Sequence, residues 1–188
     1  MHISVGIAIL LLAMFAYANV RWYLFYILVA GIILSLLSLK YKIPGIYFML
    51  KKFEKPQYIH RFPGKSALFF VAGCLLVVKL FSRDIAFASI AITTFADPVV
   101  FLIGSFGSIK YKKPFNGLKN IEGTIAGIAV SFIVASFFVS MFDALIVAVI
   151  AMLSEAFVIK LGDDIIDDNF FVPIIAGTVL YVLSRFGI

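Results

Sequence analysis

Charged residues are scarce in this chain. Asp, Glu, Lys and Arg make up 14% of its 188 residues, whereas 63% are apolar, and the mean hydropathy is +1.12. A soluble domain is usually about 45–50% apolar and about 25% charged, so this composition excludes an ordinary soluble fold. Because the apolar runs are long and hold few charges, the sequence predicts an all-α integral membrane protein rather than a membrane β-barrel.

Cysteine and histidine are also rare. The one cysteine, Cys74, excludes an intrachain disulfide, and its place inside an apolar run is typical of a small buried side chain. Together with two histidines it offers no His/Cys cluster for zinc. The chain also lacks the Gly-x-x-x-x-Gly-Lys-Ser/Thr motif of nucleotide-binding P-loops. The candidates for chemistry are therefore carboxylates and lysines.

Seven apolar segments are each close to the roughly 20 residues that a membrane-spanning helix needs. They cover residues 3–18, 22–39, 63–81, 84–103, 121–142, 143–159 and 169–186. Short and long connections alternate, so the three long loops, about 40–62, 104–120 and 160–168, should share one face. These loops hold most of the basic residues, and the positive-inside rule places them in the cytoplasm. We expect one transmembrane domain, 1–188, with about seven helices, a cytoplasmic N-terminus and a site that faces the cytosol.

Three carboxylates lie near the cytoplasmic ends of three predicted helices. Asp97 precedes Pro98, which should kink its helix, Glu155 lies just over one turn inside segment 143–159, and Glu122 opens segment 121–142. Ionisable groups at membrane depth are costly and usually face a protein interior or a wet cavity. We hypothesise a site on this leaflet. The alternatives are buried pairs with lysines and, for Glu122, helix capping.

The second long loop, GSFGSIKYKKPFNGLKNIEGT, has the features of a phosphate site. Glycines allow close approach of the backbone to a ligand, lysines donate hydrogen bonds to phosphates, and free N–H groups at a helix start favour an anion. A basic loop beside anionic lipid headgroups would look similar. The glycines are Gly104, Gly107 and Gly117, the lysines are Lys110, Lys112, Lys113 and Lys119, and the helix opens with Glu122, Gly123 and Thr124.

The third long loop carries aspartates. Carboxylates that face a phosphate site usually imply Mg²⁺ between them, and Asp168 is the candidate ligand. The alternative is that Asp168 or Asn169 is the N-cap of the last helix. Asp163 and Asp164 are expected to form a solvated turn. In the first long loop, HRFPGK places His60, Arg61 and Lys65 before a helix, where they could bind a phosphate or headgroup.

Four sequence blocks occur in a fixed order. They are HRFPGKSALFFVAG with SRDIAFASI, then ADPVVFLIGSFG, then KNIEGTIAGIAVS, and finally SEAF with DDNFFVPIIAG. Over about residues 61–183 this order resembles the CTP-dependent lipid-alcohol kinases, the family of dolichol kinase, phytol kinase and CTP-type diacylglycerol kinase, distantly related to phosphatidate cytidylyltransferases. Asn120 departs from the family's Ser/Thr, and Ala96 replaces a common Gly. The motif residues carried over are Asp97, Lys119, Glu122, Gly123, Glu155, Asp168 and Asn169.

The resemblance implies transfer of the terminal phosphate of CTP to a membrane-embedded alcohol: a dolichol-like polyprenol, another isoprenoid alcohol or diacylglycerol. Asp97 or Glu155 is expected to take the hydroxyl proton. Glu122 and Asp168 are expected to hold Mg²⁺, or another divalent cation, on the phosphates. The nucleotide-binding candidates are Lys65, Gly104, Gly107, Lys113, Lys119, Gly123, Thr124 and Asn169.

Three alternatives stay open. A cytidylyltransferase would join CMP to a lipid phosphate and release pyrophosphate. A small transporter would use Asp97 and Glu155 as a proton relay. A membrane scaffold would use the small residues Gly123 and Gly127 for helix packing. The expected partners are CTP, a lipid alcohol and the bilayer, without nucleic acid. The lipid, the choice of CTP over ATP and the oligomeric state are left open by the sequence.

Overall fold

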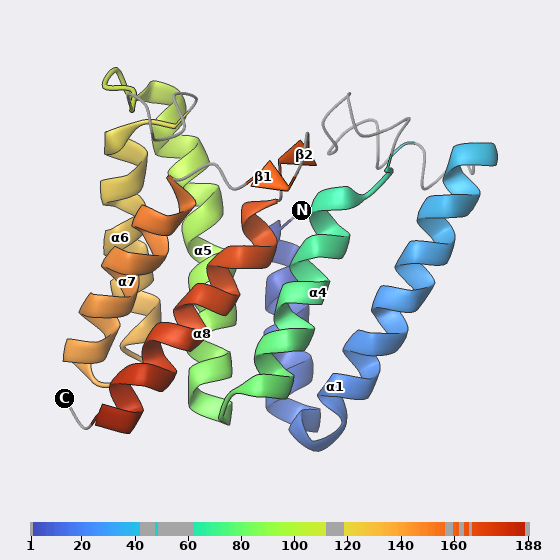
Figure 1. The fold of residues 1–188 in the computed structure, drawn as a ribbon, viewed down its shortest axis with the longest axis horizontal. Coiled ribbons are helices and arrows are strands. Elements are labelled where there is room, and N and C mark those ends of the chain that lie inside the picture. The colour runs from blue at the N-terminus through green and yellow to red at the C-terminus, as the bar shows by residue number, and fades with distance from the viewer. Residues whose placement is uncertain are drawn as a thin grey trace.

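In the computed structural model the described residues are 2–41, 48, 62–111, 119–156, 160–161, 164–165 and 167–186. The helices formed by these residues are α1 (His2–Lys40), α4 (Lys65–Leu80), α5 (Arg83–Phe106), α6 (Ile121–Ala135), α7 (Met141–Glu155) and α8 (Asp168–Phe186). Two antiparallel two-residue strands, β1 (Lys160–Leu161) and β2 (Asp164–Ile165), lie between α7 and α8. The predicted all-α class is confirmed (Figure 1).

Among the described residues, three helices are long and apolar enough to cross a membrane: Ile3–Lys40, Arg83–Phe106 and Asp168–Phe186. Helix α6 is also apolar but shorter. The helix ends that flank the three long connections, namely those after α1, after α5 and after α7, lie at the same end of the bundle (Figure 1). The alternation of long and short connections along the sequence therefore predicted which helix ends come together.

Helix α1 is broken at Ala16, where φ is −136° and ψ is 42°. Figure 1 shows the chain reversing direction near this point, so α1 consists of two arms. The sequence placed this turn at residues 19–21, a few residues too late. The ring of Tyr17 stacks on Phe87 with centroids 6.1 Å apart, and the guanidinium of Arg83 lies 5.4 Å from the Tyr17 ring centroid. These contacts with α5 hold the turn, and a local sequence pattern does not reveal them.

The connection between α6 and α7 also differs from the prediction, which put it at the Phe142–Asp143 junction. Helix α6 ends at Ala135 and α7 begins at Met141. The reason is a capping interaction: the hydroxyl of Ser140 accepts a hydrogen bond from the Asp143 N–H at 3.1 Å and donates one to the Asp143 carboxylate at 2.8 Å. Such Ser-x-x-acid pairs fix the first turn of a helix.

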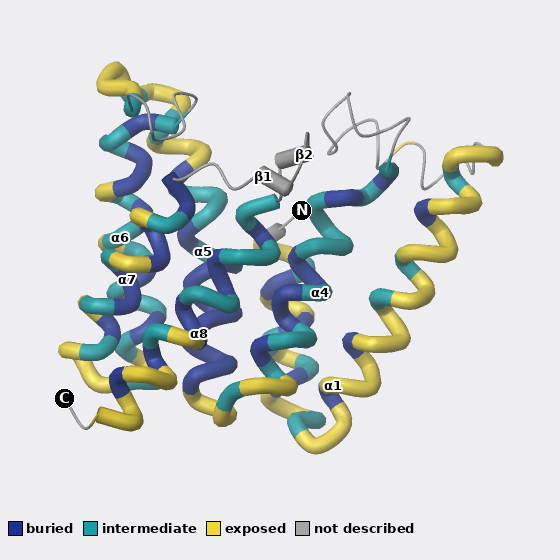
Figure 2. Tube along the Cα trace, in the orientation of Figure 1, coloured by how far each residue is buried: buried dark blue, intermediate teal, exposed yellow. Residues whose placement is uncertain are grey.

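Helix α5 is the centre of the bundle. Every residue from Ile85 to Thr94 is buried, as are Ala96 and Val100. Helices α1, α4, α6 and α8 all pack on α5, and Figure 2 shows it mostly dark blue among half-exposed neighbours. The second arm of α1 is the opposite case, because apolar side chains such as Trp22, Tyr26 and Leu36 are exposed on it. The packed core is therefore built around α5, and α1 borders it.

Glycines in α6 allow it to approach its neighbours closely. A Cβ atom on Gly123 would lie 2.7 Å from the carbonyl oxygen of Val100 and 3.1 Å from the Cα of Gly104, both in α5. A Cβ on Gly127 would lie 2.8 Å from the Sδ of Met152 in α7. Small residues at such positions let helix backbones meet. The packing role that the sequence suggested for Gly123 and Gly127 is therefore present in the structure.

Two glycines at the crossing of α5 and α6, Gly123 and Gly104, should respond differently to substitution by alanine. A Cβ on Gly104 would meet its nearest neighbour, the Gly123 Cα, at an ordinary 3.9 Å, unlike a Cβ on Gly123. We expect Gly123→Ala to lower the free energy of unfolding by about 1–3 kcal/mol through overpacking. Gly104→Ala, the matched control across the same crossing, should be neutral or slightly stabilising because alanine favours the helix. Thermal unfolding of both variants checks this, and equal losses would contradict it.

Candidate active site

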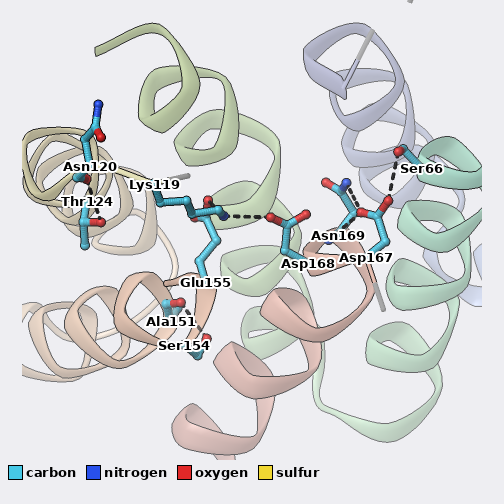
Figure 3. A network of polar contacts seen from close by, with 10 residues as sticks. All are labelled: Ser66, Lys119, Asn120, Thr124, Ala151, Ser154, Glu155, Asp167, Asp168 and Asn169. Carbon is cyan, nitrogen blue, oxygen red and sulfur yellow. Dashed lines mark hydrogen bonds and ion pairs between the residues drawn. The ribbon is translucent and has the colours of Figure 1, made fainter. Parts of the chain in front are cut away.

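An ammonium group joins three separate segments of the chain. The Nζ of Lys119, just before α6, lies 2.5 Å from Oε1 of Glu155 and 2.7 Å from Oδ2 of Asp168. Glu155 is the last residue of α7 and Asp168 the first of α8, and Figure 3 shows both carboxylates pointing at the lysine. Glu155 is 5% exposed and Lys119 is 18% exposed. The Lys119–Glu155 pair therefore lies largely out of solvent, whereas Asp168 is 37% exposed.

Asp97, on the central helix α5, completes the group. Carboxylate oxygens of Asp97, Glu155 and Asp168 all lie within 4.8 Å of one another. The three acids line a narrow pocket together with Thr93, Met152, Asn169 and Val172. The structure thus brings together both residues expected to act as the base, one of the two expected metal ligands and the lysine expected to bind phosphate.

Lys119 is the positively charged member of this group. Burial lowers the pKa of Lys119, but the attraction of Glu155 and Asp168 outweighs burial, and the pKa of the ammonium is raised above its usual value. Lys119 is therefore charged at neutral pH and is the cation that binds Glu155 and Asp168. Mg²⁺ prefers oxygen ligands at about 2.0–2.1 Å, so ligands on its opposite sides are about 4.2 Å apart. Asp97, Glu155 and Asp168 offer carboxylate oxygens, the type of ligand that Mg²⁺ takes, and these oxygens lie within 4.8 Å of one another.

The N-cap of α8 is Asp167, so the alternative in which Asp168 or Asn169 is the cap is wrong. The Oδ1 of Asp167 accepts hydrogen bonds from the Asn169 backbone N–H at 3.2 Å and from the Asn169 side-chain amide at 2.5 Å. Its Oδ2 accepts one from the hydroxyl of Ser66 at 2.9 Å. Because Asp167 caps the helix, the Asp168 carboxylate is available to bind Lys119. Sequence reasoning gave no role to Asp167 or Ser66, although an aspartate just before an acidic first turn is a signal for an N-cap.

Glu122 lies in a different set of contacts. Its Oε1 accepts hydrogen bonds from the backbone N–H groups of Ser108 and Ile109 at 2.8 and 3.0 Å. Glu122 therefore binds the loop that follows α5. It is not a member of the acidic group, which consists of Asp97, Glu155 and Asp168. A carboxylate at a helix start is equally typical of a ligand and of a loop anchor, and the sequence had left both roles open.

The neighbouring Asn120 holds the same loop. Its amide Nδ2 donates to the carbonyl oxygen of Gly107 at 3.0 Å and also to that of Gly104. Serine or threonine, expected at this position from the resemblance, could not reach two carbonyls in this way because a hydroxyl has one proton. A Cβ on Gly107 would lie 2.9 Å from Glu122 Oε2. Gly104 and Gly107 therefore contribute to the packing of this loop against the start of α6.

The remaining predicted site residues fall into two sets. Lys65 is buried in the first turn of α4, with Nζ 5.8 Å from the Phe69 ring centroid, and Thr124 is buried with its hydroxyl on the Asn120 carbonyl at 3.3 Å. Asn169 is buried and lines the acidic pocket. The others lie outside the described residues, so their predicted roles stay predictions: His60, Arg61, Lys112, Lys113, Gly117 and Asp163.

No family model, curated protein or solved structure matches this chain.

The ion pairs of Lys119 give a direct prediction for stability. Lys119→Met leaves Glu155 buried without its partner beside two other acids, and breaking a buried pair from one side costs about 3–5 kcal/mol. The double variant Lys119→Met/Glu155→Gln should recover much of this loss, because it also removes the uncompensated charge. Lys79→Met, at an exposed position of α4, is the control with little effect. A double variant no more stable than Lys119→Met alone, in thermal unfolding, would rule this account out.

Proposed function

We propose that the protein is an integral membrane kinase that transfers the terminal phosphate of CTP to a membrane-embedded lipid alcohol. The observation that carries this proposal is the meeting of Lys119 with Asp97, Glu155 and Asp168, which come from four separate segments. These are also motif residues in the resemblance to CTP-dependent lipid-alcohol kinases. Three acids that line a narrow pocket, with a lysine bound to two of them, are the kinds of group that phosphoryl transfer needs.

The proposed membrane arrangement has seven crossings. The two arms of α1 supply two and the five later helices supply the others. The N-terminus and the three long connections lie on the cytoplasmic side, in accordance with the positive-inside rule. In this arrangement the acidic pocket lies at the cytoplasmic helix ends, where CTP arrives from the cytosol. The lipid alcohol reaches the same pocket laterally from the bilayer.

The chemistry assigned to the site follows from its donors and acceptors. The ammonium of Lys119 has three N–H donors; two bind Glu155 and Asp168, and the third is assigned to a phosphate oxygen of CTP. Asp168, together with whichever of Asp97 and Glu155 is not the base, would hold Mg²⁺, which neutralises charge on the phosphates when it is bound. In this revised assignment Glu122 anchors the loop instead of binding the metal.

The reaction is a simple displacement. The lipid hydroxyl oxygen forms a bond to the terminal phosphorus of CTP, the bond from that phosphorus to the bridging oxygen breaks, and CDP leaves. The hydroxyl proton passes to a carboxylate of the site, for which Asp97 and Glu155 are the two candidates. Such transfer depends mainly on positioning and on charge stabilisation, and the packing of α5, α7 and α8 fixes these carboxylates relative to Lys119.

The identity of the products tests the proposal. Purified protein in lipid vesicles is incubated with Mg²⁺, CTP or ATP and a panel of polyprenols, shorter isoprenoid alcohols and diacylglycerol. We expect a phosphorylated lipid and CDP. Asp97→Asn and Glu155→Gln should each lower the rate, by about 10²-fold or more for the variant that removes the base. Asp143→Asn, which alters the capping pair of α7, is the control. A CDP-lipid with pyrophosphate would identify a cytidylyltransferase, and wild-type rates in both acidic variants would exclude the assigned site.

Divalent-cation binding separates the two sets of acidic contacts. Asp168→Asn should weaken Mn²⁺ binding by about tenfold or more. Loss of a residue that only hydrogen-bonds to a metal ligand already has an effect of about this size. Glu122→Gln should leave it unchanged, because the amide oxygen still accepts the backbone N–H groups of the loop. Electron paramagnetic resonance of Mn²⁺ titrated into the purified variants measures both. The opposite pattern would return the metal site to Glu122.

A further inference from the structure

The first turn of α8 carries two adjacent aspartates with different contacts. Asp168 binds Lys119 at 2.7 Å, whereas Asp167 binds Ser66, the second residue of α4, at 2.9 Å. Figure 3 shows the two carboxylates pointing to opposite sides of the helix start. The proposed site therefore lies on one side of this turn, and a hydrogen-bonded link to α4 lies on the other.

Both oxygens of the Asp167 carboxylate are in use. Oδ1 accepts two hydrogen bonds from Asn169 and closes the first turn of α8, and Oδ2 accepts the Ser66 hydroxyl. The carbonyl of Asp167 also accepts the N–H of Phe170 at 3.1 Å. Because one rigid carboxylate binds both helices, a shift of Ser66 along or around α4 must move the start of α8.

Close packing of the same two helices supports this link. A Cβ atom on Gly73 of α4 would lie 3.0 Å from the carbonyl oxygen of Asn169 and 3.1 Å from that of Phe170. Pro173 lacks an N–H, so the Asn169 carbonyl has no intrahelical donor four residues on. Gly73 lets α4 approach this part of α8, and the Ser66–Asp167 hydrogen bond then fixes how the two helix starts are aligned.

We infer that Ser66 and Asp167 are positioning residues: they hold the start of α8 so that Asp168 meets Lys119, Glu155 and Asp97. Their catalytic consequence rests on the proposed function. Neither residue is assigned a contact with substrate. The link between Ser66, Asp167 and Asp168 is a property of the fold, and its effect on stability can be measured whether or not the protein is a kinase.

Kinetics of Ser66 variants test the consequence. Ser66→Ala removes the hydrogen bond from Asp167 Oδ2, and we expect kcat for lipid phosphorylation to fall about tenfold, less than the roughly 10²-fold that a 1 Å misplacement can cost. The KM for CTP should change little, because Lys119 is retained. Ser66→Thr keeps the hydroxyl and should restore kcat. A wild-type kcat in Ser66→Ala overturns the inference.

A double-mutant cycle in thermal unfolding tests the positioning without any activity. If Ser66 holds Asp168 against Lys119, Ser66→Ala and Asp168→Asn remove parts of one interaction, and their combined shift in unfolding temperature should be smaller than the sum of the single shifts. Ser66→Ala with Asp143→Asn, at the other end of α7, should be additive. Additive shifts in the Ser66–Asp168 cycle overturn the inference.

The kinetic experiment and the unfolding experiment distinguish failure of the inference from failure of the proposed function. If the wild type phosphorylates no alcohol, the proposed function fails and the stability cycle alone decides whether Ser66 and Asp167 position Asp168. If Ser66→Ala does not give folded protein, Ser66→Cys replaces it in the cycle, because the thiol is of similar size but is only a weak hydrogen-bond donor. Coupled shifts then support the inference, and additive shifts contradict it.

Discussion

The rest of the site depends on one ammonium group. Lys119 lies between α5 and α6 in the chain, yet it binds the end of α7 and the start of α8. Without it, three carboxylates would share a narrow pocket and repel one another, and Glu155 is too deeply buried for water to screen it. The lysine thus makes this acidic group compatible with a folded protein. In the proposed function, a divalent cation among these carboxylates would offset their repulsion of the nucleotide phosphates.

Helix packing determines the positions of the carboxylates around Lys119. Helix α5 is buried at every residue from Ile85 to Thr94 and contacts α1, α4, α6 and α8, so Asp97 has a fixed place at the centre of the bundle. Gly123 brings α6 close to α5, and Gly73 brings α4 close to α8. Polar contacts at the helix ends then complete the arrangement: Asn120 and Glu122 anchor one loop, and Asp167 anchors the start of α8. The site is the product of close helix packing together with specific capping.

Much of this arrangement could be predicted from the sequence. The apolar segments predicted the helices. The alternation of loop lengths predicted that Asp97, Lys119, Glu155 and Asp168 lie at one end of the bundle. Long-range contacts could not be predicted. The break at Ala16 depends on contacts of the neighbouring Tyr17 with α5. A run of adjacent aspartates does not show which one caps the helix, and no local pattern links Ser66 to a residue 101 positions away.

The central claim is that Lys119 and the three acids form one nucleotide site. It is tested most directly by an experimental structure of the protein in lipid with Mn²⁺ and a CTP analogue whose terminal phosphate cannot be transferred. The account predicts Mn²⁺ density among Asp97, Glu155 and Asp168, and the terminal phosphate within hydrogen-bonding distance of the Lys119 ammonium. A nucleotide bound elsewhere, with Lys119 still paired to Glu155 and Asp168 and no metal between the acids, would contradict it.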